Sequence, residues 1–256
     1  TSINFPHGIW VVGDYVYVLN TGIGTLQRFN RNTGETSIPG DRVAGADRFG
    51  YRNASNGGAT ILGRPYVMAK HSSTIYLAEN NKIRTLNVDS GKSTFLIGNS
   101  VDNYKESTGG DARFSTIQGL DVSGDGNWLY VADRFNNRIR KVSISQAKSY
   151  WISGTGAVNT TGPTNGYKEG SANEAKFNNP TGLVLSHDGN YVYVADTGNN
   201  RIRKVRLSDG YTWLVAGNGQ AGFADGAGSS AQFNKPVGIA LDKSQGRYLY
   251  VAETNN

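Results

Sequence analysis

Three stretches of this chain repeat one another closely, and such tandem copies restrict the possible folds more than any other feature. Residues 112–142 read ARFSTIQGLDVSGDGNWLYVADRFNNRIRKV, and residues 175–205 read AKFNNPTGLVLSHDGNYVYVADTGNNRIRKV. A further copy at 231–256 reads AQFNKPVGIALDKSQGRYLYVAETNN. Copies this similar indicate an array of equivalent units, each covered by its neighbours.

Two weaker copies, at 5–29 and 62–86, keep the same order of apolar runs and polar turns. An acid or amide ends the second apolar run of every copy, and this position can be used to measure the length of the repeat. The residues are Asn20, Glu79, Asp133, Asp196 and Glu253. Successive markers are 59, 54, 63 and 57 residues apart. A unit of this size, with about four strands and no helical stretch, is typical of a β-propeller blade.

Within one copy we expect strands at 182–186, 191–195, 201–205 and 211–216. The turns between them are rich in Gly and Asn, which tolerate the positive φ that short hairpins need. The second strand is apolar or aromatic on both alternate faces, so it must be covered on both sides. Blades packed against one another provide that cover.

The sequence therefore predicts an all-β fold, a β-propeller with four-stranded blades, as a single domain over 1–256. About four and a half to five blades fit into the chain. We expect them at 5–40, 62–97, 114–153, 177–216 and, truncated, 233–256. A long polar connection is expected at 41–61.

The order of motifs resembles the NHL-repeat family of β-propellers. Phe-x-x-Pro-x-Gly precedes a strand that ends Tyr-Val-Ala-Asp, and Asn-x-Arg-Ile-Arg-Lys-Val follows. The best copy carries these motifs on Phe177, Pro180, Gly182, Asp196, Asn199, Arg201, Ile202 and Arg203. The resemblance implies six blades, so we expect the missing strands and a sixth blade to lie outside this sequence. A compact five-bladed ring is the alternative.

Residues shared by the copies are expected to serve architecture. Phe114, Phe177 and Phe233 each precede a first strand, where a large ring can fill the gap between blades. The acid at the end of the second strand is expected to accept hydrogen bonds from its own turn and to pair with an arginine across the blade junction. Sets such as Asp133, Asn136 and Arg138 would then be structural, since catalytic groups rarely recur in every blade.

Enzymatic chemistry finds little support in the sequence. The chain has no Cys and three His, of which only His7 is expected near the channel mouth, with Asp121 the one acid on a first strand. A catalytic zinc site needs three protein ligands. We therefore expect no catalytic residues, no metal and no cofactor. A propeller enzyme of the lyase or lactonase kind, with a metal at the channel mouth, stays open as an alternative.

An RNA-binding or polyanion-binding domain is the other alternative, because some NHL propellers bind RNA and the net charge is +6. Strand alternation, however, places Arg201 and Arg203 on one face and Ile202 on the other, so the basic runs need not form one surface. RNA readers usually add exposed aromatic side chains, and Phe135 beside Arg134 is the one such turn. Nucleic acid is therefore the less favoured partner.

The favoured interpretation is a non-enzymatic scaffold that presents loops to a protein or glycan, including neighbouring subunits of an assembly. No apolar run is long enough to span a membrane. Two sequons, at Asn53 and Asn159, favour an extracellular or cell-surface location and are candidate glycosylation sites. The candidate contacts lie in connections into first strands and in turns after second strands: His7, Arg64, Gln118, Arg134, Phe135, Thr181 and Thr197.

Overall fold

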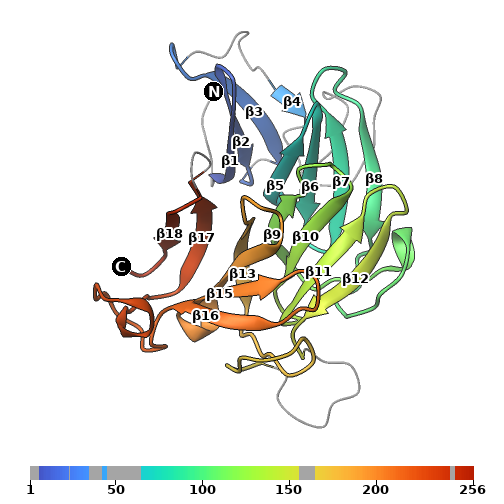
Figure 1. Cartoon of the computed structure of the whole chain (residues 1–256). Coiled ribbons are helices and arrows are strands. Elements are labelled where there is room, and N and C mark those ends of the chain that lie inside the picture. Colours follow the sequence, from blue (N-terminus) through green and yellow to red (C-terminus); the bar gives the residue numbers. More distant parts are fainter. Residues whose placement is uncertain (1–5, 23, 35–41, 45–64, 156–164, 243–245) are drawn as a thin grey trace. The chain divides into compact units, whose positions relative to one another are not determined.

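The computed structural model of the chain describes residues 6–22, 24–34, 42–44, 65–155, 165–242 and 246–256 (Figure 1). These residues form antiparallel sheets with one-turn 3-10 helices, so the expected all-β class is confirmed. Within them, no helix is long and apolar enough to cross a membrane. The chain divides into two compact units, Thr1–Ser100 and Val101–Asn256, which are described separately. The single domain expected from the sequence stays a prediction.

In its described residues, the first unit contains two four-stranded sheets. One sheet has the order β1 (Pro6–Val12), β2 (Tyr15–Asn20), β3 (Thr25–Asn30) and β4 (Arg42–Ala44). The other has the order β5 (Pro65–His71), β6 (Thr74–Glu79), β7 (Lys82–Asn87) and β8 (Ser93–Gly98).

Strand β4 lies where the sequence had predicted a polar connection, so the blade limit at residue 40 was wrong. Ala44 pairs with Leu26, and Arg42 pairs with Gln27 across an irregular register. A strand of three residues is too short to show the alternation by which strands are recognised in a sequence.

The second unit contains two complete sheets and one of two strands, each in chain order from its first strand. The third sheet is β9 (Ile117–Val122), β10 (Trp128–Asp133), β11 (Arg138–Ser143) and β12 (Lys148–Ser153). The fourth is β13 (Pro180–Leu185), β14 (Tyr191–Asp196), β15 (Arg201–Arg206) and β16 (Thr212–Ala216). The fifth pairs β17 (Pro236–Leu241) with β18 (Leu249–Glu253).

Hydrogen bonds from short polar side chains fix the tight turn between first and second strands. In the fourth sheet Asp188 accepts hydrogen bonds from the hydroxyl group of Ser186 and from the backbone N–H of Asn190. Gly189 lies at φ +70°, a conformation that glycine adopts without steric cost. Ser123, Asp125 and Asn127 form the same turn in the third sheet. A tight turn therefore joins the expected first and second strands.

The glycine of the Pro-x-Gly motif lets first strands of neighbouring sheets lie close together. A Cβ atom on Gly182 would stand 2.4 Å from the carbonyl oxygen of Val237, and one on Gly119 would stand 2.1 Å from that of Thr181. Neither approach leaves room for a side chain. The spacing of the first strands in this unit thus depends on glycine at these positions.

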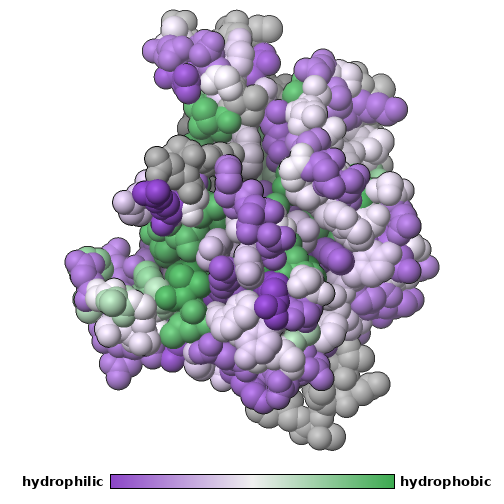
Figure 2. Space-filling model, in the orientation of Figure 1, coloured by the Kyte–Doolittle hydropathy of each residue, from purple (hydrophilic) through white to green (hydrophobic). Residues whose placement is uncertain are grey.

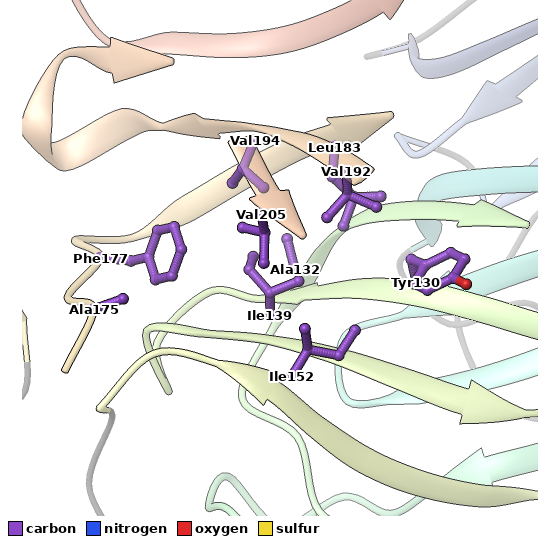
Figure 3. Close-up of a cluster of buried hydrophobic side chains, with 10 residues drawn as sticks. All are labelled: Tyr130, Ala132, Ile139, Ile152, Ala175, Phe177, Leu183, Val192, Val194 and Val205. Carbon is purple, nitrogen blue, oxygen red and sulfur yellow. The ribbon is translucent and has the colours of Figure 1, made fainter. Parts of the chain in front are cut away.

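The core between the third and fourth sheets combines side chains from both with a phenylalanine from the connection that joins them (Figure 3). Tyr130, Ala132, Ile139 and Ile152 face Leu183, Val192, Val194 and Val205, and Phe177 closes one end of the cluster. Phe177 is fully buried, as is Phe114 at the start of the third sheet. Burial of such a ring stabilises the fold by roughly 1.5–3 kcal/mol.

The fifth sheet is less covered than the other two sheets of this unit. Hydrophobic atoms are visible on the surface over β17 (Figure 2), and its apolar residues Val237, Ile239 and Leu241 are only half-buried. On β18, the Tyr250 side chain is 64% exposed, whereas the equivalent Tyr130 on β10 is buried. Phe233, which corresponds to Phe114 and Phe177, is half-buried.

Candidate functional site

The recurrent acid at the end of the second strand lies at the centre of a buried polar network in the third sheet. Arg140 Nη1 donates to Asp133 Oδ2 at 2.7 Å, and neither side chain is exposed. The backbone N–H of Ser115 donates to Asp133 Oδ1, and Asn136 Nδ2 donates to Oδ2. Arg140 also forms a two-point ion pair with Glu106 at 3.0 Å for each bond.

The fourth sheet repeats this network. Arg203 Nη1 donates to Asp196 Oδ2 at 3.0 Å. The backbone N–H of Asn178 and the side-chain Nδ2 of Asn199 also donate to this carboxylate. The acid therefore accepts bonds from its own turn, as expected. The expected arginine was wrong, because the partner is the second arginine of Arg-x-Arg and lies in the same sheet. Both arginines share the face of the acid, and the register places Arg201 opposite Asp196 and Arg203 opposite Val194, two residues earlier on β14.

The first arginine of each pair has a different role. Arg138 stacks over the ring of Tyr104 at 3.6 Å, and Arg201 stacks over Tyr167 at 3.9 Å. Both tyrosines belong to a Tyr-Lys-Glu triplet in the connection before the sheet. That repeated triplet was the sequence signal that could have revealed these partners.

The link across the junction between sheets is made by an amide. Asn137 Oδ1 accepts the backbone N–H of Asn179 at 2.8 Å, and Asn200 Oδ1 accepts that of Lys235 at 3.0 Å. Both asparagines adopt left-handed backbone conformations, with φ of 53° and 51°. Asn is one of the few residues with a side chain that tolerates this region. The second Asn of Asn-Asn-Arg therefore joins neighbouring sheets.

Burial dominates the electrostatics of these acids. It raises the pKa of Asp196 to about 6, although Arg203 and three donated hydrogen bonds oppose the shift. Burial also raises the pKa of Asp133, against the same kinds of partner. A shifted pKa can indicate a catalytic group. Here, however, the oxygens of both carboxylates already accept hydrogen bonds in equivalent networks, which fits a structural role.

The threonine that follows the acid joins neighbouring sheets as well. Thr197 Oγ1 lies 2.7 Å from Thr181 Oγ1 and 2.6 Å from the carbonyl oxygen of Pro236. In the first unit, Thr21 Oγ1 donates in the same way to the carbonyl oxygen of Pro65. Thr181 and Thr197, both candidate contacts from the sequence, are buried with their hydroxyl groups in these bonds.

The turn between β10 and β11 departs from this pattern. Arg134 replaces the threonine, and Phe135 takes the place of Gly198. A Cβ atom on Gly198 would lie 2.5 Å from Asn178, whereas the equivalent of Asn178 in the third sheet is the smaller Ser115. Phe135 is consequently accommodated, and its side chain is 53% exposed.

The structure places Arg134 and Phe135 together. The guanidinium of Arg134 lies over the Phe135 ring, 4.7 Å from its centroid. The backbone N–H groups of the two residues donate to the carbonyl oxygens of Thr116 and Ser115. These two hydrogen bonds therefore fix the backbone of the turn, and the stacked cation–aromatic pair lies on its outer side. A pair of this kind contributes roughly 0.5–1 kcal/mol at an exposed site.

The other candidate residues are placed as follows. Gln118 is half-buried on β9. His7 belongs to β1, but its side chain lies outside the described residues, as do Arg64, Asn53 and Asn159. Asp121, the acid expected near the channel, accepts the backbone N–H of Leu185 in the neighbouring sheet. In the described part of the chain, no three His, Asp or Glu side chains are grouped as a metal site would require.

Comparison with known proteins agrees with the repeat seen in the sheets. Residues 177–205 match the NHL repeat, and residues 7–22 and 118–139 match the LVIVD repeat. NHL repeat-containing protein 2 of Bos taurus is 26% identical over the whole of this chain. One copy of the repeat thus matches the NHL repeat, in agreement with the resemblance seen in the sequence. The protein SUPPRESSOR OF QUENCHING 1, chloroplastic, of Arabidopsis thaliana is also 26% identical over the whole chain.

The chain spans 38% of the Bos taurus protein and 24% of the Arabidopsis thaliana protein. Among solved structures, it resembles a chain of a nidogen/laminin complex with a TM-score of 0.62, at 14% identity over 98% of this chain and 73% of that one. A streptogramin B lyase gives 0.58, at 15% identity over 97% and 62%. These likenesses show the β-propeller fold, which two proteins of different function share.

Proposed function

We propose that this NHL chain is a non-enzymatic interaction module that binds a protein partner, with Arg134 and Phe135 as the centre of the contact. The observation that carries the proposal is the exposed ring of Phe135, with the half-buried Arg134 stacked over it, at the one described turn where Arg-Phe replaces a threonine and its neighbour. The shared residues are already engaged in holding the sheets together. The exposed ring of Phe135 is the part of this turn that a partner would contact.

The local chemistry supports a protein partner. Aromatic and arginine side chains contribute a large share of the binding energy at protein interfaces. The stacking of Arg134 on Phe135 limits the side-chain freedom that would be lost on binding, and the anchored backbone limits it further. Gln118, on β9 of the same sheet, is proposed as part of the surrounding surface, and His7 and Arg64 are proposed as contacts of the first unit.

The buried threonines fit this surface less well than the exposed pair. Thr181 and Thr197 use their hydroxyl groups at the sheet junction, so a partner could reach them only if that junction changed. We therefore assign them to the support of the surface.

We further propose an extracellular or cell-surface location within a larger assembly. The two sequons favour it, and a structural neighbour of this chain comes from a nidogen/laminin complex. Expression in a secretory host followed by enzymatic removal of N-glycans tests the location. Asn53→Gln and Asn159→Gln should each remove one glycan and one step in mass. Export without any glycan on either residue would contradict the use of both sequons.

Immobilised wild-type and variant chains test the partner class. Phe135→Ala and Arg134→Ala should lose a captured protein, whereas Tyr211→Ala, which removes an exposed aromatic on the fourth sheet, should retain it. Loss of capture after ribonuclease treatment would favour the RNA-binding alternative, and loss after deglycosylation of the partner would favour a glycan ligand. Equal capture by wild type and Phe135→Ala would overturn the proposed contact.

A further inference from the structure

Two connections in the second unit place like charges directly opposite each other. Isolated antiparallel bridges join Lys105 to Arg113 before the third sheet and Lys168 to Lys176 before the fourth. Opposite residues of an antiparallel bridge bring their side chains to the same side, where two like charges are destabilising. Each of these connections therefore contains an unfavourable electrostatic contact.

The backbone of the bridge does not need these cations. Before the fifth sheet the equivalent residues are Ala224 and Gln232, and they form the same bridge. The connections align without a gap, as 104–114, 167–177 and 223–233. The cations before the third and fourth sheets therefore serve something other than the shape of the connection.

The connection before the fourth sheet neutralises one of its cations with an acid of its own. Lys168 Nζ lies 3.3 Å from Glu174 Oε1, and both side chains are exposed. Ser171 Oγ donates to the other oxygen of this carboxylate and so fixes its position. The repulsion between Lys168 and Lys176 is thus reduced within the connection itself.

The connection before the third sheet lacks this compensation. Asp111 is equivalent to Glu174 but is one methylene group shorter. Among the described residues, no carboxylate forms an ion pair with Lys105 or Arg113. Lys105 is exposed, and the half-buried Arg113 has a buried Nε without a hydrogen-bond partner. We call Lys105 and Arg113 the cationic pair.

The cationic pair lies close to the turn that carries Phe135. Asn103, two residues before the pair, accepts Asn136 Nδ2 through its carbonyl oxygen at 2.9 Å. Ser115, two residues after the pair, accepts the backbone N–H of Phe135 at 3.1 Å. Two residues of extended chain span roughly 7 Å. One short segment of a partner can therefore reach both the exposed ring and the cationic pair.

We propose that the cationic pair binds a carboxylate of the partner protein, next to the apolar side chain that contacts Phe135. This inference rests on the proposed function. A carboxylate would accept charge-assisted hydrogen bonds from Arg113, and the ammonium group of Lys105 would add a second positive charge. The exposed acids Asp102 and Asp111 in the same connection would repel a continuous polyphosphate more than a single carboxylate. An acidic protein segment is therefore favoured over a nucleic acid.

The probe is a fluorescently labelled peptide, Ser-Glu-Ser-Phe-Ser-Glu-Ser. It places a carboxylate two residues from an aromatic ring on either side, which matches the span of roughly 7 Å. The control peptide has Gln in place of both Glu residues. It retains the ring, the length and the capacity for hydrogen bonding, and it removes the charge.

The connection before the fifth sheet supplies substitutions that the bridge accepts. Lys105→Ala with Arg113→Gln gives the cationic pair the side chains found there. Lys168→Ala with Lys176→Gln makes the same change, with the same loss of charge, before the fourth sheet, and it is the matched control. Fluorescence anisotropy at physiological salt should show that the first double variant binds the Glu peptide at least about fivefold more weakly than wild type. The control should differ from wild type by less than about twofold.

Asp111→Glu tests why the cationic pair is uncompensated. The substitution restores the side-chain length of Glu174, so the carboxylate should pair with Lys105 and compete with the peptide. Binding of the Glu peptide should weaken by at least about twofold with no change in net charge. Unchanged or tighter binding would contradict the argument.

Further outcomes separate this inference from the proposed function. Equal affinity of wild type for the Glu and Gln peptides, or equal losses in the two double variants, would overturn the carboxylate contact. If Phe135→Ala then weakened both peptides, the contact at Phe135 would stand without it. Loss of the Glu peptide from the first double variant but not from Phe135→Ala would retain the carboxylate site and overturn the contact at Phe135.

Two more results would count against the inference. Absence of binding of both peptides up to about 1 mM would overturn it, and capture of a protein that depends on Phe135 would still support the proposed function. Tighter binding of an oligouridylate than of the Glu peptide, lost in the first double variant, would assign the cationic pair to phosphate groups.

Discussion

Asn20 and Gln27 in the first sheet occupy the positions that Asp133 and Arg140 occupy in the third. Asn20 Nδ2 donates to Gln27 Oε1 at 3.2 Å, and both side chains are buried. The third sheet instead has a buried ion pair with a 2.7 Å bond. The two regions show that the position requires a complementary buried pair, whether charged or neutral. This supports a structural role for the recurrent acid.

The neutral pair and the charged pair should differ in how much stability the fold loses when one partner is removed. A neutral amide left without its partner loses a hydrogen bond, at about 1–3 kcal/mol. A buried ion left without its partner costs about 3–5 kcal/mol. Glu79 and Arg84 in the second sheet, 3.3 Å apart and buried, belong to the charged class.

The largest effect is expected for Arg140→Ala. It leaves Asp133 buried without its cation and removes the two-point bond to Glu106, so the free energy of unfolding should fall by about 3–5 kcal/mol. Urea unfolding followed by tryptophan fluorescence measures it, because Trp128, Trp151 and Trp213 all lie in the second unit. Gln27→Ala should cost less, and a larger loss for Gln27→Ala would reverse the comparison.

The next effect is a dependence on pH that only the charged pairs can have. The pKa of Asp196 in the folded state, about 6, exceeds its ordinary value of 3.8, so the folded state binds more protons between pH 4 and pH 6. The contribution to stability is therefore full below about pH 4 and is lost as the pH rises through 6, by roughly 3 kcal/mol.

Urea unfolding of wild type and Asp196→Asn at pH 4.5 and 6.5 checks this sign. The variant should lose less stability over the interval, because Asn does not titrate. Asp188 and Asp209 have folded pKa values lowered to about 2 by hydrogen bonds, so their contribution changes below this window. Stability of the wild type that rises between pH 4.5 and 6.5 would contradict the expected sign.

A smaller net effect on stability is expected when the charged pair of the third sheet is replaced by the neutral pair of the first. Asp133→Asn combined with Arg140→Gln removes both charges and retains the possibility of a hydrogen bond. The double variant should be more stable than the sum of the single variants predicts, with a coupling of at least about 1 kcal/mol. Additive losses would mean that the neutral pair works only in the surroundings of the first sheet.

The smallest effect on stability is expected at the exceptional turn. Phe135→Ala should change the free energy of unfolding by less than about 0.5 kcal/mol, because the ring lies on the surface. Phe177→Ala, at a buried ring, should cost about 3–5 kcal/mol. Urea unfolding of the two variants distinguishes a residue that serves a contact from one that serves packing. Equal losses of unfolding free energy would contradict this distinction.

Much of the fold could be predicted from the sequence because the repeat is strong where strands are long. The strands of the fourth sheet lie within a residue or two of the predicted ranges. Strand β4 was missed, because three residues carry no periodicity. The six blades that the family resemblance implies for the complete protein remain a prediction.

The candidate site was predictable only in part. Arg134 and Phe135 stand out because they break a pattern, and comparison of the copies is enough to find them. Their stacking and the use of the hydroxyl groups of Thr181 and Thr197 depend on distances across turns and neighbouring sheets. No motif within one copy contains those distances.

The sequence by itself determined which positions are equivalent, because tandem copies align without any coordinates and period-two alternation follows from strand geometry. Only the tertiary structure decided which arginine meets which acid and that an asparagine crosses the junction between sheets. It also decided that Glu253 accepts hydrogen bonds from Asn234 and Asn256, as Asp196 does from Asn178 and Asn199. The physical reason is that these contacts join the connection before a sheet to strands some thirty residues later in the chain, and folding alone brings them within hydrogen-bond distance.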